Sequence, residues 1–257
     1  METIGSAIQW FGDPANWSGS QGIPVRLFEH LQLSFFPVLF ALIPALIVGL
    51  YIGHNRRFEF ISINIANLGR AIPSFAWLAL LFPVQLRLGL GFSSWATVVA
   101  LFFLAIPPIL TNTHVGVREV DKDLIEAARG MGMSGRQILT RIELPLATPF
   151  IIAGIRTSVV QVIATATLAA LIAGGGLGVF IVSGFALGET GRDQLLGGAI
   201  LIAMLAIAAE IAFGLLERFV SPKTASRKSR DIKVQPGGGP VVGMRIPEVD
   251  PSVGAGG

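Results

Sequence analysis

Long apolar runs separated by short polar stretches dominate the pattern along the chain. Residues 39–52 and 195–209 carry no charged side chain. A helix needs about 20 apolar residues to cross a hydrocarbon core roughly 30 Å thick, whereas a membrane β-barrel would show segments of about 10 residues that alternate in polarity. The continuous runs therefore predict an all-α membrane protein. We predict a polytopic bundle of about five transmembrane helices, at residues 31–52, 65–86, 94–115, 149–173 and 195–216.

Three stretches fall outside these spans. Residues 174–185 are apolar but open with Gly174-Gly175-Gly176, which favours a short re-entrant or interfacial piece over a sixth span. Residues 1–30 precede the membrane domain, which covers residues 31–220. The tail at 221–257 combines a basic run with Pro- and Gly-rich sequence. Such a segment cannot bury enough apolar area to offset its ordering entropy, so we expect disorder. Its basic run either touches anionic lipid headgroups or is a solvated flank.

Composition excludes an ordinary soluble domain. The chain is 52% hydrophobic and only 14% charged, against about 25% charged in typical soluble proteins. The net charge of +3 could indicate a nucleic-acid partner, but in a polytopic membrane protein basic residues mark the cytoplasmic loops. We therefore expect no nucleic-acid partner.

Basic side chains gather after span one, after span three and in the tail. They are Arg56 and Arg57, then Arg118, Lys122, Arg129, Arg136 and Arg141, then Arg218, Lys223, Arg227, Lys228, Arg230, Lys233 and Arg245. The loops on the other side hold only Arg26, Arg87 and Arg192. An odd number of spans makes this distribution consistent, and it predicts an extracytoplasmic amino terminus and a cytoplasmic carboxyl terminus.

Residues that carry enzymatic or metal chemistry are sparse. The chain has no cysteine, and its three histidines are scattered, so no metal site is expected. Neither His-Glu-x2-His nor Gly-x-Ser-x-Gly occurs, which argues against a membrane enzyme. Gly130-x-Gly132-x-x-Gly135 spells the dinucleotide fingerprint, but that motif binds nucleotide only after a strand. A P-loop is also absent from the sequence. We expect no cofactor in this chain, and expect ATP and Mg²⁺ to be bound by a partner ATPase.

A polar insert over residues 119–145 separates spans three and four. Asp123 with Glu126, and Ser134 with Gln137, have the spacing of helix amino-terminal caps. Gly130, Gly132 and Gly135 follow the first pair and interrupt the helical pattern. The insert is therefore predicted to form two short helices that meet at a glycine hinge.

The flanks of this hinge refine the prediction. Ala127 and Ala128 are small, so another surface could approach the first short helix closely. Pro145 and Pro149 restrict the backbone just before span four.

The insert carries a motif with fixed spacing. Glu126-Ala127-Ala128 is followed by Gly132, and then by Ile142, Leu144 and Pro145. This pattern resembles the cytoplasmic coupling loop of permease subunits in bacterial ABC importers. The resemblance implies that the segment from Glu126 to Gly132 sits in a groove of an ATPase, with Gly132 allowing the bend. It also implies that Ile142, Leu144 and Pro145 anchor the loop to the membrane helices.

Further segments carry a wider resemblance. They are residues 30–34, 71–74, 108–113, 143–157 and 164–178. Through these segments, residues 17–222 are similar to permeases for the osmoprotectants glycine betaine, carnitine and choline. The resemblance implies the type I ABC importer fold and a place in the bacterial cytoplasmic membrane. It also implies three kinds of partner: two ATP-binding subunits, a second permease (this chain or a paralogue), and an extracytoplasmic substrate-binding protein. A permease for methionine or another small solute is the alternative, followed by a non-transporting scaffold or sensor.

Two ionisable residues fall inside the predicted spans, where such groups are functional candidates. Arg156 in span four and Glu210 in span five are expected at similar depth, so they could form an ion pair. Alternatively, Arg156 reaches the headgroups and Glu210 faces a wet crevice. Tyr51 and the four tryptophans are widely separated. The sequence therefore shows no aromatic cage for a quaternary ammonium, and recognition is assigned to the binding protein.

Overall fold

The computed structural model describes residues 2–55, 60, 64, 72–91 and 93–220. Within these ranges every regular element is helical. The principal helices are α1 (Glu2–Gly12), α2 (Ile23–Asn55), α4 (Ser74–Arg87), α5 (Trp95–Arg118), α6 (Lys122–Gly130), α7 (Gly135–Ile138), α8 (Leu144–Thr165), α9 (Gly178–Ala186) and α10 (Arg192–Val220). Short 3₁₀ or π segments join them at Pro14–Trp17 (η1), Leu139–Glu143 (η2), Ala166–Ile172 (η3) and Gly188–Gly191 (η4).

Four helical runs in the described part of the chain are long and apolar enough to cross a membrane. They are Ile23–Asn55, Trp95–Arg118, Gly135–Ile172 and Gly188–Val220. The helical membrane fold expected from the sequence is thus confirmed. The described part of the second predicted span is α4, which has 14 residues and is only about 21 Å long. The first part of that span, Arg56, Arg57 and the tail from residue 221 lie outside the described residues.

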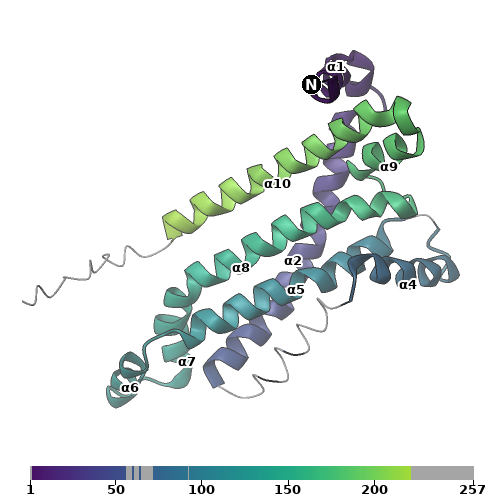
Figure 1. The fold of residues 1–257 in the computed structure, drawn as a ribbon. Helices are drawn as coiled ribbons and strands as arrows, with labels where there is room; N and C mark the ends of the chain where they lie inside the picture. Colours follow the sequence, from purple (N-terminus) through teal and green to yellow (C-terminus); the bar gives the residue numbers. More distant parts are fainter. Residues whose placement is uncertain (1, 56–59, 61–63, 65–71, 92, 221–257) are drawn as a thin grey trace, which may run out of the picture. The chain divides into compact units, whose positions relative to one another are not determined.

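Helix α5 packs against both α2 and α8, and α2, which crosses behind them in Figure 1, also contacts α8. Small residues make these approaches close. A Cβ added at Gly49 of α2 would lie 2.9 Å from Cβ of Thr113, and one at Gly154 of α8 would lie 2.8 Å from Cβ of Asn112. Helices in a membrane associate by such close packing, since lipid gives no hydrophobic drive between them. The core of the bundle therefore runs along α5.

Helix α10 is apolar but little of it is buried inside this chain. Only 6% of its most apolar stretch is buried. Met204, Ile207, Ile211 and Leu215 recur at helical spacing and are exposed. An exposed apolar face of this size requires a covering of lipid or protein, as expected for an integral membrane protein.

The structure corrects the start of the first predicted span and adds a helix before it. Helix α2 begins at Ile23, eight residues before the predicted start. Arg26, Glu29 and His30 interrupt the apolar run, but Arg26 pairs with Glu29 one turn away at 2.7 Å and so keeps the helix. Helix α1, within the predicted amino-terminal segment, was not anticipated; its Trp10 packs edge-on against Phe180 of α9, with ring centroids 5.2 Å apart.

The restriction expected at Pro145 and Pro149 does not interrupt the helix that leads into span four. Helical structure runs continuously from Gly135 through η2 into α8. Pro145 lies at the first turn of α8 and Pro149 lies inside it. Because the helix is continuous here, each proline lacks the N–H that would bond to the preceding turn; the π turn of η2 changes the helical register just before Pro145. Most of the segment at 174–185 lies in α9, which begins at Gly178 and whose nine residues are too few to cross a bilayer.

Candidate functional site

The polar insert folds as two short helices, α6 and α7. Asp121 caps α6, because its side chain accepts a hydrogen bond from the backbone N–H of Asp123 at 2.9 Å. The predicted cap, Asp123, instead lies in the first turn, where a carboxylate favours the helix dipole. For α7 the predicted cap is confirmed: Ser134 and Gln137 form a reciprocal capping box. Both helices therefore have fixed starting points.

Between the helices the chain turns at Gly132, which has a φ of +82°. This left-handed conformation favours glycine. A Cβ added to Gly132 would meet nothing within 4 Å. The hinge therefore needs glycine for its backbone conformation and not for space within this chain.

A small core of its own stabilises the loop. Val120, Ile125, Ala128 and Ile138 are buried together, with Met133 and Ile142 packed against them. Ala128 is only 1% exposed, so the expectation that both alanines leave room for another surface is corrected. Helical spacing turns Ala128 inward beside Ile125 and leaves Ala127 outward.

The exposed side of α6 and its carboxyl-terminal cap carries an apolar strip among charged residues. Leu124 is 45% and Met131 77% exposed, and Ala127 between them is also exposed. These three residues, spaced i, i+3 and i+7, lie on one face of the helix. We call Leu124, Ala127 and Met131 the outer patch. Glu126, also exposed, lies on the same short helix.

At the base of the loop, a buried carboxylate connects it to the end of α2. Glu143 is only 4% exposed, and its Oε2 lies 2.5 Å from Nδ1 of His54. The sequence did not reveal this contact, since the residues lie 89 positions apart. Beside it opens a pocket of about 180 Å³, lined by His54, Asn55, Lys122, Ile125, Glu126, Arg129 and Glu143.

The remaining motif residues follow Glu143 or flank it. Ile142 is half-buried against the loop core. Leu144 packs against Val117 of α5 and Ile151 of α8. Pro145 is exposed at the first turn of α8. Ile142 and Leu144 thus contact the loop on one side and the membrane helices on the other.

The structure brings Arg156 and Glu210 into an ion pair between α8 and α10. The guanidinium of Arg156 also contacts Glu217, which lies seven residues further along α10, at 3.2 Å. All three side chains are partly exposed. Sequence reasoning named the first two and missed the second carboxylate, which lies seven residues from Glu210 on the same side of α10.

Comparison with known proteins places this loop in a family. Residues 45–225 match the model of the binding-protein-dependent transport system inner membrane component. This chain belongs to that family. Its members are permease subunits of transporters, which is the class that the loop motif predicted.

Two curated relatives match most of this chain. The carnitine transport permease protein OpuCB of Listeria monocytogenes is 40% identical over 207 residues, which are 80% of this chain and 91% of the relative. The glycine betaine/carnitine/choline transport system permease protein OpuCB of Bacillus subtilis (strain 168) is 38% identical over 195 residues, 76% and 87% of the two chains.

A solved structure supports the fold. One chain from the inward-facing MetNI methionine ABC transporter aligns with a TM-score of 0.67 and 24% identity, over 77% of this chain and 95% of that chain. At this identity the likeness shows the fold of the family and not the solute. The chain is thus an integral membrane transporter permease. The α6–α7 loop is its most distinctive part outside the long apolar helices.

Proposed function

We propose that this chain is the permease subunit of an ATP-driven importer of quaternary-amine osmoprotectants, such as glycine betaine, carnitine or choline. The identity of 34 to 40% to permeases named for these solutes, over most of both chains, supports the substrate class. The methionine transporter shares the fold at lower identity, so methionine remains the second candidate. A non-transporting scaffold is disfavoured, because it gives no reason for an ordered loop with an exposed apolar patch.

The outer patch is the observation that carries the coupling role. An apolar patch held in water on a stable short helix marks a protein contact. We propose that an ATPase subunit covers Leu124, Ala127 and Met131, with Glu126 and Gly132 in the same interface. ATP and Mg²⁺ would then be bound by that partner and not by this chain.

The geometry suggests how force would pass from the ATPase to the membrane helices. Movement of α6 is transmitted through the loop core at Ile125 and Ala128, because a packed core moves as a unit. Ile142 and Leu144 carry it to α5 and α8, and the Glu143–His54 contact carries it to α2. Closure of two ATPases would thus turn the pathway outward.

The basic residues support one orientation. Arg118, Lys122, Arg129, Arg136 and Arg141 lie on or beside the α6–α7 loop, and basic residues favour the cytoplasmic side. We propose that this loop and the carboxyl terminus are cytoplasmic, the amino terminus is outside, and an external binding protein delivers the solute. A second permease subunit, this chain or a paralogue, would complete the pathway.

Substituting the middle of the outer patch tests the coupling role. In proteoliposomes containing the permease, its ATPase and its loaded binding protein, Ala127→Trp is expected to reduce uptake of radiolabelled choline at least tenfold and to prevent copurification of the ATPase. The permease itself should insert and keep its thermal stability, because Ala127 points away from the loop core.

A matched control separates docking from general damage. Thr140→Trp adds the same bulk to an exposed residue whose hydroxyl bonds only to its own helix, at Arg136 O, and it should retain uptake and ATPase binding. Wild-type uptake by Ala127→Trp would overturn the coupling assignment. Uptake of methionine but not of choline, glycine betaine or carnitine by the wild type would overturn the substrate class.

A further inference from the structure

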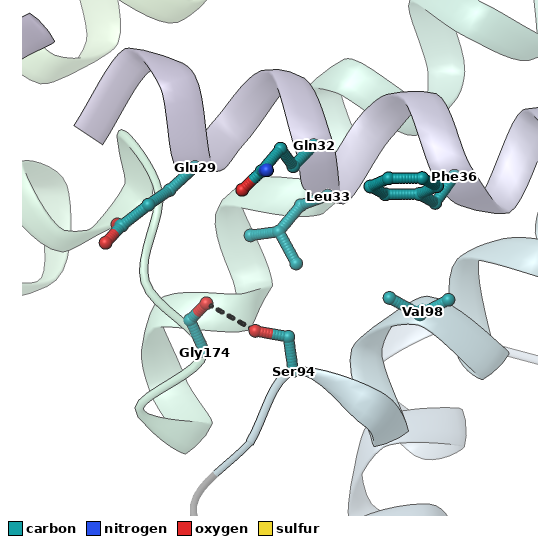
Figure 2. Close-up of a pocket in the computed structure, with 7 residues that line it drawn as sticks. All are labelled: Glu29, Gln32, Leu33, Phe36, Ser94, Val98 and Gly174. Carbon is teal, nitrogen blue, oxygen red and sulfur yellow. Dashed lines mark hydrogen bonds between the residues drawn. The ribbon is translucent and has the colours of Figure 1, made fainter. Parts of the chain in front are cut away.

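An open cavity lies at the end of α2 opposite the α6–α7 loop (Figure 2). Its volume is about 270 Å³, and it is bordered by α2 between Glu29 and Phe36, by the start of α5 and by Gly174. This volume falls just below the range of about 300–1,000 Å³ that is usual for drug-sized ligands. The cavity is therefore of the size that suits a small solute, not a peptide.

One end of the cavity is apolar and aromatic. Figure 2 shows Phe36 and Val98 facing each other across it, with Leu33 beside them. The Phe36 ring is supported by Phe40, stacked at 6.2 Å, and by Phe35, edge-on at 5.7 Å. A quaternary ammonium has no N–H to donate and is recognised by aromatic faces and apolar contact. This end can therefore receive a trimethylammonium group.

The other end is polar. Glu29 lies there, with the Gln32 amide between it and Phe36 (Figure 2). Oε2 of Glu29 accepts hydrogen bonds from Arg26 at 2.7 Å and from the backbone N–H of Gly176 at 2.8 Å. Neither Oε1 of Glu29 nor the Gln32 amide bonds to another group in the described ranges. Both remain able to bind the polar end of a solute.

We propose that this cavity is a transit subsite for the solute, with the trimethylammonium group against Phe36 and the polar end at Gln32 and Glu29. The inference deepens the proposed function and rests on it. Sequence reasoning saw no aromatic cage because it considered tyrosine and tryptophan, whereas the aromatic here is a phenylalanine presented by α2.

The polar end should discriminate between solutes. The hydroxyl of choline can donate a hydrogen bond to the Glu29 carboxylate, while the carboxylate of glycine betaine is repelled by it and uses Gln32. A charge-assisted hydrogen bond is stronger than a neutral one. Glu29→Gln is therefore expected to lower choline uptake relative to glycine betaine uptake by about fivefold, with each solute delivered at saturating concentration.

Binding is tested on the intact transporter without its binding protein. The probe is choline chloride, and the readout is saturation-transfer NMR of its N-methyl protons. The bilayer consists of phosphatidylethanolamine and phosphatidylglycerol, so that no lipid headgroup supplies a trimethylammonium group. We expect saturation of the N-methyl signal in the wild type and about threefold weaker choline binding in Phe36→Leu. Phe36→Tyr should restore it.

Phe28→Leu is the matched control, since Phe28 is an exposed phenylalanine of α2 that does not line the cavity. It should bind choline as the wild type does. Unchanged binding in Phe36→Leu, or no N-methyl saturation in a wild type that does import choline, overturns the subsite alone. A wild type that imports no quaternary amine with its loaded binding protein overturns the proposed function instead.

Discussion

The two ends of α2 are both held by a carboxylate, but they meet very different loops. At the first end, Glu29 of α2 accepts a hydrogen bond from the backbone of Gly176 at 2.8 Å. At the other end, His54 of α2 contacts the buried Glu143 at 2.5 Å. The first contact fixes a glycine-rich connection after η3, and the second fixes the base of the α6–α7 loop. One helix thus connects the cavity at one end to the outer patch at the other.

The glycines of these loops show the difference most clearly. Gly176 and Gly132 both have left-handed backbone, with φ of +78° and +82°. A Cβ at Gly176 would lie 3.1 Å from Nδ1 of the buried His30, whereas one at Gly132 meets nothing within 4 Å. The same backbone device therefore serves close packing in one loop and leaves a free surface in the other. A loop that packs on its own chain is structural, and one that turns an open surface outward is available to a partner.

The largest expected effect is on stability, and it is tested by placing the same residue at Gly176 and at Gly132. Gly176→Val should lower the free energy of unfolding by about 3 kcal/mol, since a β-branched residue adds left-handed strain and overpacks against His30. Gly132→Val adds only the strain, about 1–2 kcal/mol. Thermal unfolding of the detergent-solubilised permease measures both.

Solute uptake should show that Gly132 matters for transport, although the substitution there costs less stability than the one at Gly176. Gly132→Val is expected to insert and fold, yet to lose transport because the altered hinge misplaces the outer patch. Equal losses of stability would contradict the packing difference, and normal solute-stimulated uptake by Gly132→Val would contradict its place in the coupling surface.

A smaller effect is expected at the base of the α6–α7 loop. His54→Leu removes the partner of Glu143 and leaves a buried carboxylate without it, which should cost about 2 kcal/mol of unfolding free energy. Glu143→Gln keeps a hydrogen-bonding side chain beside His54 and is expected to cost less than half as much. Denaturant titration of the purified permease gives both values.

The His54→Leu variant also tests the role of α2 in coupling. If the contact transmits movement of the loop, His54→Leu also lowers the ATPase stimulation produced by loaded binding protein, while ATPase copurification is kept. A His54→Leu variant that is as stable as the wild type would show that Glu143 does not depend on this contact.

Sequence reasoning succeeded where the signal is local. The long apolar runs gave the membrane helices, and the i, i+3 spacing of Ser134 and Gln137 gave the capping box found at α7. It failed where the outcome depends on packing between distant segments. Whether Ala127 or Ala128 faces outward is decided by the loop core, and the pairing of His54 with Glu143 by the approach of α2 to that loop.

The sequence also placed the start of the first membrane helix too late. Arg26 and Glu29 lie before the predicted first span, but α2 includes both, and Glu29 accepts hydrogen bonds from Arg26 and from the backbone of Gly176. The prolines before span four restrict the backbone, yet the helix continues through them after the π turn of η2. In the first case the contact with Gly176, 147 positions away, is one that the local sequence does not show.

The contact of Arg156 with Glu210 and Glu217 gives the smallest expected effect. It is a baseline for the changes at the two ends of α2. Its side chains are partly exposed, and ion pairs of this kind contribute little. Arg156→Gln should therefore shift the thermal midpoint by only about 2 °C, far less than the changes at either end of α2. Arg156→Glu gathers three carboxylates and should reduce uptake more strongly. The double variant Arg156→Glu/Glu210→Arg places the new arginine beside residues 156 and 217 and is expected to restore uptake. If the double variant rescues neither single substitution, α8 and α10 are not held together by this pair, and the carboxylates of α10 act independently of Arg156.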